Sequence, residues 1–302
     1  MSENQLVSAI VTTYKRPVEI VERALQSIVA QEYENLEIIL VNDAPEDNVL
    51  AGNLKKMTST LSKKVKYIEM KHNSGACAAR NRGIKESLGE FVAFLDDDDE
   101  WKPQKIKKQI DSFTDTEIGL SYCNFWINEE GKKELRIHTD KQLPEGNIFN
   151  KLFEKNYIGS SSFPMIRKNV LIKAGLFNPN MPALQDWELW LRIAQKCKVV
   201  YIDEPLGIYY FYKGDRISAH PERRIKGFEI IYNQHKEYLR DNRKTQAGYL
   251  AEGITIYINA KNFKEAFNLY NTMLHADGMN IKRNTRLLAK IVIRFFFPAK
   301  IV

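Results

Sequence analysis

The chain has 302 residues, of which 44% are apolar. That is enough to bury the core of one large domain, or of one domain with an appendage. Glycine and proline are not enriched, so extensive disorder is not expected. The three cysteines, Cys77, Cys123 and Cys197, are far apart and form no CxxC pair. This spacing excludes a disulfide framework and is typical of a protein from a reducing cytosol.

The formal net charge of +7 favours anionic partners such as nucleic acid, acidic lipid or phosphorylated substrates. The alternative is ordinary solvated lysine and arginine. The charge is spread along the chain and forms no recognition motif, so we expect no nucleic-acid partner. We expect no signal peptide, because Met1 to Gln5 is polar and the apolar run that follows is interrupted at Thr12 and Thr13. We also expect no membrane-spanning segment, because no stretch reaches the roughly 20 apolar residues that cross a bilayer.

The first hundred residues alternate between strand and helix patterns, which indicates a parallel sheet with helices on both faces. One helix is predicted to begin at Pro17, a residue tolerated in a first turn. A second helix is predicted at Ala78 to Leu88 and ends at Gly89. The expected strands are short apolar runs: Val7–Val11, Leu36–Val41, Val65–Met70 and Phe91–Leu95.

The next hundred residues are less regular and suggest a mixed continuation of the same sheet. A hairpin turn is expected at 128–131, and a helix at Leu184 to Ala194. Further strands are predicted at Leu120–Ile127, Ser161–Ile166, Val199–Ile202 and Leu206–Tyr212. Beyond about residue 220 only helical patterns occur. We therefore expect an α/β domain over residues 1–220 and a helical region over residues 221–302.

Two features characterise the helical region. Tyr249 to Leu274 predicts two packed helices with a break near Asn259 to Asn262. Arg283 to Val302 predicts a basic amphipathic helix. Such a helix can lie on an anionic membrane surface, or its apolar face can pack on the helical hairpin.

Four consecutive carboxylates, Asp96 to Asp99, follow the strand predicted at Phe91–Leu95. Ligands of parallel α/β sheets bind beyond the carboxyl ends of the strands. Clustered carboxylate oxygens at that edge suit Mg2+ or Mn2+, which can hold a diphosphate. The alternative is an acidic first turn of the helix predicted near Pro103. That alternative explains Asp99 well and Asp96 poorly, because Asp96 ends a buried strand.

Three other polar segments are candidates for the same site. Asp43 also ends an apolar strand and could accept a hydrogen bond from a base or ribose, or it could simply form a turn. The small-residue segment Asn73 to Gly83 carries Arg80, which could bind phosphate, although a helix-packing face is the simpler interpretation. Asp186, near a predicted helix start, could deprotonate an acceptor hydroxyl.

The two tryptophans beside Asp186 leave a further choice open. Trp187 and Trp190 could pack against sugar rings, or they could belong to the core.

In this order and spacing, the segments resemble family 2 glycosyltransferases, and the likeness covers roughly Val7 to Tyr212. The resemblance implies the GT-A nucleotide-diphospho-sugar transferase fold, a Rossmann-like mixed sheet flanked by helices, here with a C-terminal α-helical extension. It further implies that Thr12 and Tyr14 line the nucleoside, with Tyr14 stacked on the base. By the same match, Asp43 reads the uracil.

The remaining assignments also follow from the resemblance. Asp96-Asp97-Asp98 matches the DxD motif, with Asp98 as the main ligand of Mn2+ or Mg2+. Asp96 and Asp97 border the ribose and the donor sugar, and Arg80 lies near the donor phosphates or the acidic motif. Asp186 matches the catalytic base, although Gln185 replaces the usual preceding glutamate.

The activity that the resemblance implies is inverting transfer of one sugar from a UDP-sugar to a hydroxyl of a glycan acceptor, for example a lipid-linked oligosaccharide. Bacterial capsule, exopolysaccharide or O-antigen synthesis would fit. The processive Gln-x-x-Arg-Trp motif is absent from the sequence. The expected location is the cytoplasm or the inner face of the plasma membrane, and the C-terminal helices could also form a homo-oligomer.

Two other functions compete with this one. A sugar-nucleotide nucleotidyltransferase has a similar sheet, but it needs a glycine-rich loop after its first strand, and residues 12–17 contain no glycine. A non-enzymatic module that binds an anionic surface would account for the charge alone.

Overall fold

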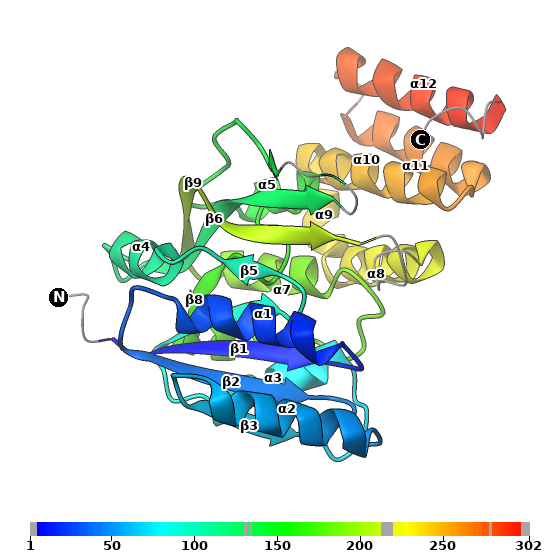
Figure 1. Cartoon of the computed structure of the whole chain (residues 1–302). Coiled ribbons are helices and arrows are strands. Elements are labelled where there is room, and N and C mark those ends of the chain that lie inside the picture. The colour runs from blue at the N-terminus through cyan, green and yellow to red at the C-terminus, as the bar shows by residue number, and fades with distance from the viewer. Residues whose placement is uncertain (1–4, 130–131, 133–134, 213–219, 278–279, 297–302) are drawn as a thin grey trace. The chain divides into compact units, whose positions relative to one another are not determined.

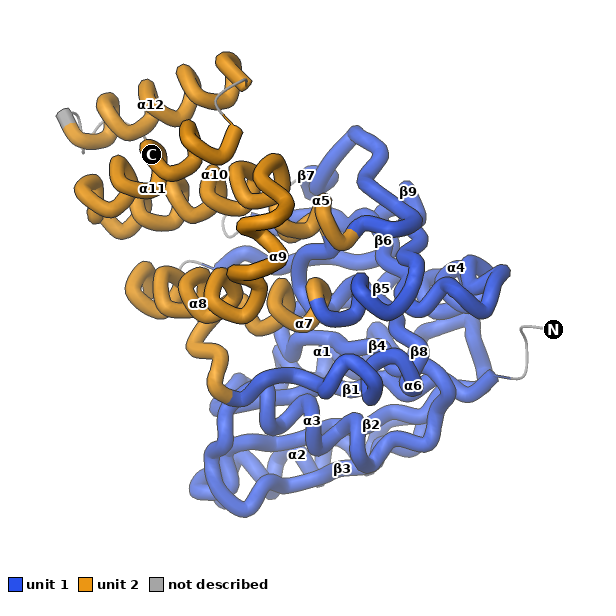
Figure 2. The backbone as a smooth tube through the Cα atoms, turned by 180° about the vertical axis from the view of Figure 1, so that it is seen from behind, with its two compact units in different colours: residues 1–148, 158–179, 192–213 blue, residues 149–157, 180–191, 214–302 orange. Residues whose placement is uncertain are grey.

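The computed structural model describes residues 5–129, 132, 135–212, 220–277 and 280–296. The chain forms two compact units, which Figure 2 shows in blue and orange. Unit 1 comprises Met1–Ile148, Ile158–Pro179 and Arg192–Lys213; unit 2 comprises Phe149–Tyr157, Asn180–Leu191 and Gly214–Val302. Unit 2 thus takes in two earlier segments besides the C-terminal region, and a domain boundary at residue 220 stays a prediction.

The described residues of unit 1 contain a nine-stranded mixed sheet in the order β3-β2-β1-β4-β8-β6-β9-β5, with β7 paired to β6 (Figure 1). Strands β3, β2, β1 and β4 are parallel, and β8 lies antiparallel between β4 and β6. The strands are β1 (Val7–Thr13), β2 (Leu36–Asn42), β3 (Val65–Glu69), β4 (Phe91–Asp96), β5 (Glu100–Trp101), β6 (Ile118–Glu129), β7 (Arg136–Ile137), β8 (Met165–Arg167) and β9 (Lys198–Phe211).

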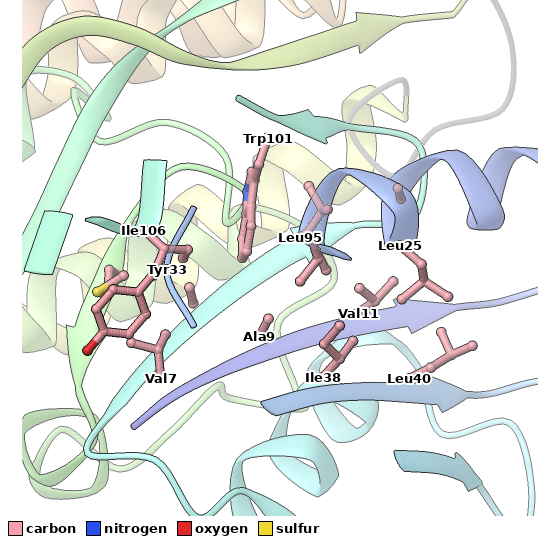
Figure 3. Close-up of a cluster of buried hydrophobic side chains, with 14 of the residues drawn as sticks. Val7, Ala9, Val11, Leu25, Tyr33, Ile38, Leu40, Leu95, Trp101 and Ile106 are labelled. Atoms are coloured by element: carbon pink, nitrogen blue, oxygen red, sulfur yellow. The ribbon is translucent and has the colours of Figure 1, made fainter. Parts of the chain in front are cut away.

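Helices cover both faces of the parallel part of this sheet. Alternate side chains of β1, β2 and β4 point to one face, where they meet α1, α2 and α4 in a buried cluster (Figure 3). The other face packs on α3, whose Gly83 lies close to Ile10 and Val41. The helices of unit 1 are α1 (Val18–Val29), α2 (Asn48–Thr60), α3 (Ala76–Glu86), α4 (Lys105–Ser112) and α6 (Lys168–Lys173).

The described part of unit 2 is helical. Helix α10 packs against α5, α8 and α11, and α12 packs on α11. Its helices are α5 (Phe149–Glu154), α7 (Gln185–Ala194), α8 (Pro221–Gln234), α9 (Lys236–Asp241), α10 (Arg243–Asn259), α11 (Phe263–Asp277) and α12 (Ile281–Phe296); the last residues of α7 belong to unit 1. None of the described helices is long and apolar enough to cross a bilayer.

Most predicted elements are confirmed, including the alternating strands and helices of the first hundred residues and the helix break after Asn259. The strand predicted at Ser161–Ile166 is wrong before Met165, where β8 begins, so only its last two residues are strand. The two strands predicted between 199 and 212 are one strand, β9. The hairpin turn predicted at 128–131 is wrong over its first two residues, because Asn128 and Glu129 belong to β6 and pair with β9; residues 130 and 131 lie outside the described part. Strand β6 nevertheless pairs antiparallel with β7, as a hairpin requires.

Helix α2 has no counterpart among the predicted elements. It begins after Asp47, whose side chain accepts a hydrogen bond from the Leu50 backbone N–H at 2.9 Å. An N-cap aspartate is therefore the signal that could have located it. Its buried stripe is narrow, which explains why apolar periodicity does not predict it.

The contact between α3 and β1 gives a stability prediction with an internal control. A Cβ added at Gly83 would lie 2.5 Å from Ile10 Cγ2, whereas one added at Gly52 in α2 meets nothing within 4 Å. Gly83→Ala is expected to lower the free energy of unfolding by roughly 1–2 kcal/mol, because overpacking outweighs the gain in helix propensity. Gly52→Ala is expected to raise it by about 0.5–1 kcal/mol. Urea unfolding of both variants checks the pair; equal shifts would contradict the close approach of α3 to β1.

Candidate active site

Except for Asp186, the polar side chains predicted from the sequence lie around the ends of β1, β2 and β4 in unit 1. The register pairs Thr12 with Asp96 across β1 and β4, so these strands end side by side. Asp43 directly follows β2, and its backbone N–H donates to the Thr13 carbonyl at 2.9 Å. Three strands from the first hundred residues thus bring their carboxyl ends to one edge of the sheet, where α/β proteins bind ligands.

Asp96 is held by a cation and by a turn of serines. Arg80 of α3 donates to its Oδ1 at 2.6 Å, and the hydroxyls of Ser160 and Ser161 donate to its two oxygens at 3.1 and 3.0 Å. Burial disfavours the charged form, but Arg80 and the serine hydroxyls hold the pKa of Asp96 below its usual value. Asp96 therefore stays a carboxylate at the end of β4.

Asp97 and Asp98 share one arginine. Arg16 Nε lies 3.0 Å from Asp97 Oδ1, and Arg16 Nη2 lies 2.9 Å from Asp98 Oδ2. The second oxygen of Asp97 accepts a hydrogen bond from Thr13 Oγ1 at 2.7 Å. Asp97 is thus bound on both oxygens and its side chain is 9% exposed, whereas that of Asp98 is 22% exposed.

The electrostatics of these two carboxylates follow from their surroundings. Burial raises the pKa of Asp97, and Arg16 and Thr13 offset part of the rise. Burial, together with the negative charges of Asp97 and Asp96, raises the pKa of Asp98 to about 6. Asp98 is the more exposed of the two. An added positive charge beside it would stabilise its ionised form and lower its pKa.

Asp99 has a different role from the one predicted. It is fully buried, its Oδ2 accepts from Ser162 Oγ at 2.6 Å, and its Oδ1 accepts from the Tyr210 backbone N–H at 3.0 Å. Burial and the neighbouring carboxylates raise its pKa well above the usual range. The prediction that Asp99 begins the following helix is wrong, because α4 begins only at Lys105 and Asp99 instead ties the acidic run to β9.

Asp43 anchors the start of α3. Its two carboxylate oxygens accept hydrogen bonds from the backbone N–H groups of Ser74 and Gly75 at 2.9 and 2.8 Å. Burial raises its pKa, and these two hydrogen bonds offset part of the rise. A carboxylate has about four lone-pair sites, so Asp43 can still accept a hydrogen bond from a bound base.

The loop after β1 carries the remaining nucleoside candidates. Thr12 is half-buried within β1, while Tyr14 is 46% exposed. Lys15 adopts a positive φ of 50° and pairs with Glu46 at 3.1 Å. The exposed Tyr14 ring is available to stack on a planar ligand.

Several residues around the acidic run were not predicted. Arg23 of α1 donates to the Asp98 carbonyl at 2.6 Å, pairs with Glu100 at 3.0 Å and lies over the Tyr210 ring at 3.9 Å. Thr13 and Arg16 come from the end of β1, and the serine turn precedes β8. Arg16 could have been found from the sequence, because a cation three residues after a strand end lies near the expected site. No sequence pattern distinguished Ser160, Ser161 and Ser162.

The residues present fit a divalent metal that arrives with a phosphate ligand. Among the described residues, no group of three or more His, Cys, Asp and Glu side chains is arranged to hold a metal by itself. Mg2+ is usually bound through one or two carboxylates together with substrate phosphates and water. The hard oxygen of the partly exposed Asp98 matches that kind of site.

Asp186 lies in unit 2, in the first turn of α7. Its Oδ1 accepts from the Trp187 backbone N–H at 2.7 Å, and Leu184 just before the helix has a positive φ of 60°. Trp187 and Trp190 are 2% and 0% exposed, and Trp187 Nε1 donates to the Leu152 carbonyl at 2.6 Å. The indoles therefore belong to the core, and the idea that they pack against sugar rings is wrong.

Comparison with known proteins shows to which family the chain is related. Residues 8–175 match the model of "Glycosyl transferase family 2". The chain is 29% identical over 278 residues to an uncharacterized glycosyltransferase of Rickettsia conorii; the match covers 89% of this chain but 45% of that protein, so the chain spans about half of that relative. It is 27% identical to WcaA of Escherichia coli, a putative colanic acid biosynthesis glycosyl transferase, over 82% of this chain and 87% of that one.

A third relative has a more specific name. The chain is 26% identical, over 71% of its length and 80% of the relative's, to WfaP of Escherichia coli, a UDP-Glc:alpha-D-GlcNAc-diphosphoundecaprenol beta-1,3-glucosyltransferase.

Solved structures show the same fold. TarS 1–349 of S. aureus in complex with UDP-GlcNAc superposes with a TM-score of 0.70 at 17% identity, covering 96% of this chain and 89% of that one. The mannosyltransferase PcManGT of Pyrobaculum calidifontis, in complex with GDP-Man and Mn2+, gives a TM-score of 0.61 at 15% identity and covers 98% and 88%. The mixed sheet with flanking helices is the GT-A fold, and the chain belongs to glycosyl transferase family 2.

Proposed function

We propose that this protein is an inverting, metal-dependent glycosyltransferase that moves one sugar from a UDP-sugar to a hydroxyl of a glycan acceptor. The observation that carries the proposal is the meeting of Asp43, Arg80 and the acidic run at the carboxyl ends of β1, β2 and β4. Family membership supports the reaction class. Binding of UDP-GlcNAc by the similar fold of TarS supports the choice of a UDP-sugar.

In this proposal, the end of the sheet binds the donor. Tyr14 stacks on the base, Asp43 accepts its ring N–H, and Thr12 lines the nucleoside. Asp96 and Asp97 border the ribose and the donor sugar, and Arg80 keeps Asp96 charged beside them. Asp98 would hold Mn2+ or Mg2+, and the metal would supply positive charge to the nucleoside diphosphate leaving group.

Asp186 is the proposed general base. It would take the proton from the acceptor hydroxyl as that oxygen attacks the anomeric carbon from the face opposite the diphosphate. Attack from the opposite face inverts the configuration, so a UDP-α-sugar gives a β-linked product. The beta-1,3 linkage in the name of WfaP agrees with this stereochemistry for one relative.

The proposed acceptor is a lipid-diphosphate-linked glycan in bacterial surface polysaccharide synthesis. The support comes from two relatives, because WcaA is named for colanic acid biosynthesis and WfaP for a diphosphoundecaprenol acceptor. Such an acceptor would place the enzyme at the inner face of the plasma membrane.

A direct product assay separates this function from its rivals. Incubation with a UDP-sugar and Mn2+ should release UDP, while UTP with a sugar 1-phosphate should yield no pyrophosphate. Pyrophosphate without UDP would favour a nucleotidyltransferase, and neither product with any donor would favour a binding module.

Helix α12 has the composition of a membrane-surface helix. Its 16 residues contain five cations and no acid. Leu287 and Ile291 are buried, so one face of α12 packs on the other helices of unit 2. This packing is the alternative to membrane binding that the sequence left open. Val292 and Ile293 are both 45% exposed beside the cations. We propose that the exposed side of α12 contacts anionic lipid, since apolar and cationic side chains together favour that surface.

Vesicle pelleting tests the membrane contact with the full chain. Lys282→Glu/Arg286→Glu is expected to reduce binding to vesicles that contain anionic lipid by roughly tenfold or more, at about 1 kcal/mol per cation near the surface. The matched control is Lys236→Glu/Arg240→Glu on α9, which should bind like the wild type. Equal binding by both double variants would contradict the contact, and a salt-independent dimer in light scattering would instead indicate a homo-oligomer.

A further inference from the structure

Arg16 occupies a position that the proposed mechanism does not use. It lies in the loop between β1 and α1, two residues after Tyr14 and next to Pro17. Lys15 before it has a positive φ of 50°, a conformation uncommon for a residue with a side chain. The side chain of Arg16 is 35% exposed, so solvent and ligands can reach it.

The guanidinium of Arg16 spans two carboxylates. It contacts Asp97 Oδ1 at 3.0 Å and Asp98 Oδ2 at 2.9 Å. Thr13 occupies the other oxygen of Asp97. Arginine is always charged and its planar fork holds two acceptors at once. Arg16 therefore places one positive charge between these two adjacent side chains.

We infer that Arg16 is a positioning residue that holds Asp98 until donor and metal bind together, and that it then exchanges Asp98 for the donor diphosphate. The inference rests on the proposed role of Asp98 as metal ligand. A cation at Asp98 and the guanidinium of Arg16 compete for the same carboxylate, since both are positive and both need its oxygens. A diphosphate offers Arg16 a replacement partner with the bidentate geometry that it prefers.

Two consequences follow for binding. Free metal should bind weakly, because it must enter beside the positive charge of Arg16 without offering that side chain a new partner. Metal should bind more tightly with UDP, because the diphosphate both ligates the metal and accepts Arg16. Arg16 thereby contributes to the coupling between metal and nucleotide, and coupling is reciprocal by linkage.

Mn2+ binding measured by electron paramagnetic resonance, with and without UDP, tests the inference without any turnover. In Arg16→Gln, the affinity for Mn2+ alone is expected to rise on the order of tenfold, because a competing charge is removed. The factor by which UDP tightens Mn2+ binding should fall by a similar amount. Arg16→Lys keeps the charge and should retain weak binding of Mn2+ alone.

The matched control is Lys198→Gln. Lys198 pairs with Glu117 at 2.6 Å at the start of β9, the opposite end of that strand from Tyr210. This variant loses the same charge and should bind Mn2+ like the wild type. Thermal melts of all variants establish that each is folded.

The outcomes separate this inference from the proposed function. If the wild type binds Mn2+ with UDP, but Arg16→Gln binds Mn2+ alone no more tightly and keeps the full UDP effect, Arg16 is only structural and the inference is overturned. If the wild type binds no Mn2+ even with UDP, the metal role of Asp98 and the inference fall together.

Discussion

Asp186→Asn is expected to lower kcat for sugar transfer by about 10²–10⁴-fold, the usual contribution of a general base. Asparagine keeps the Oδ1 atom that accepts the Trp187 backbone N–H, so the first turn of α7 should stay intact. It cannot take a proton from the acceptor hydroxyl. Steady-state kinetics with saturating donor and acceptor measure the loss, and the affinity for UDP with Mn2+ should be unchanged.

The control for this variant is Asp241→Asn, an exposed aspartate at the end of α9 in the same unit. It should turn over like the wild type. Near-normal transfer by Asp186→Asn, with unchanged metal dependence, would show that another group is the base. A parallel loss of UDP affinity would show that the residue belongs to donor binding.

Asp98→Asn is expected to reduce Mn2+-stimulated turnover on the order of 10³-fold, because metal-ion charge stabilisation contributes several kcal/mol to such reactions. The substitution removes the charge of the more exposed carboxylate in the Arg16 pair and nearly preserves its size. Calorimetric titration with UDP should show weaker binding in Mn2+ and no such weakening in EDTA.

A charge-matched control for Asp98 is Asp47→Asn. Asp47 caps α2 through the Leu50 N–H, and asparagine caps helices about as well as aspartate. This variant should retain both Mn2+ stimulation and UDP affinity. If Asp98→Asn keeps full Mn2+ stimulation, the metal ligand lies elsewhere.

The sequence was sufficient to predict the sheet and the edge at which the site forms. Alternating strands and helices imply a parallel sheet, and its strand ends must meet, so Asp43 and Asp96 could be brought together from spacing alone. Arg80 could be placed near the same strand ends, because its helix α3 directly precedes β4 in the chain.

The partners of each carboxylate could not be predicted in this way. Ser160, Ser161 and Ser162 contact the acidic run from more than sixty positions away, and they precede an apolar run that is typical of a strand. Asp99 looks like its three neighbours in sequence, yet the Tyr210 backbone, 111 residues later, makes it a buried structural residue. Such contacts depend on how β8 and β9 join the sheet, which local pattern does not specify.

In the proposed function, the acidic run binds a metal and a nucleotide sugar for transfer. A panel of UDP- and GDP-sugars, incubated with the wild-type protein in Mn2+ or in EDTA and assayed for released nucleoside diphosphate, tests it most directly. Nucleoside diphosphate is expected to be released from at least one UDP-sugar in Mn2+ and from none above background in EDTA. Release that is equally fast in EDTA, or no release from any donor in Mn2+, would contradict it.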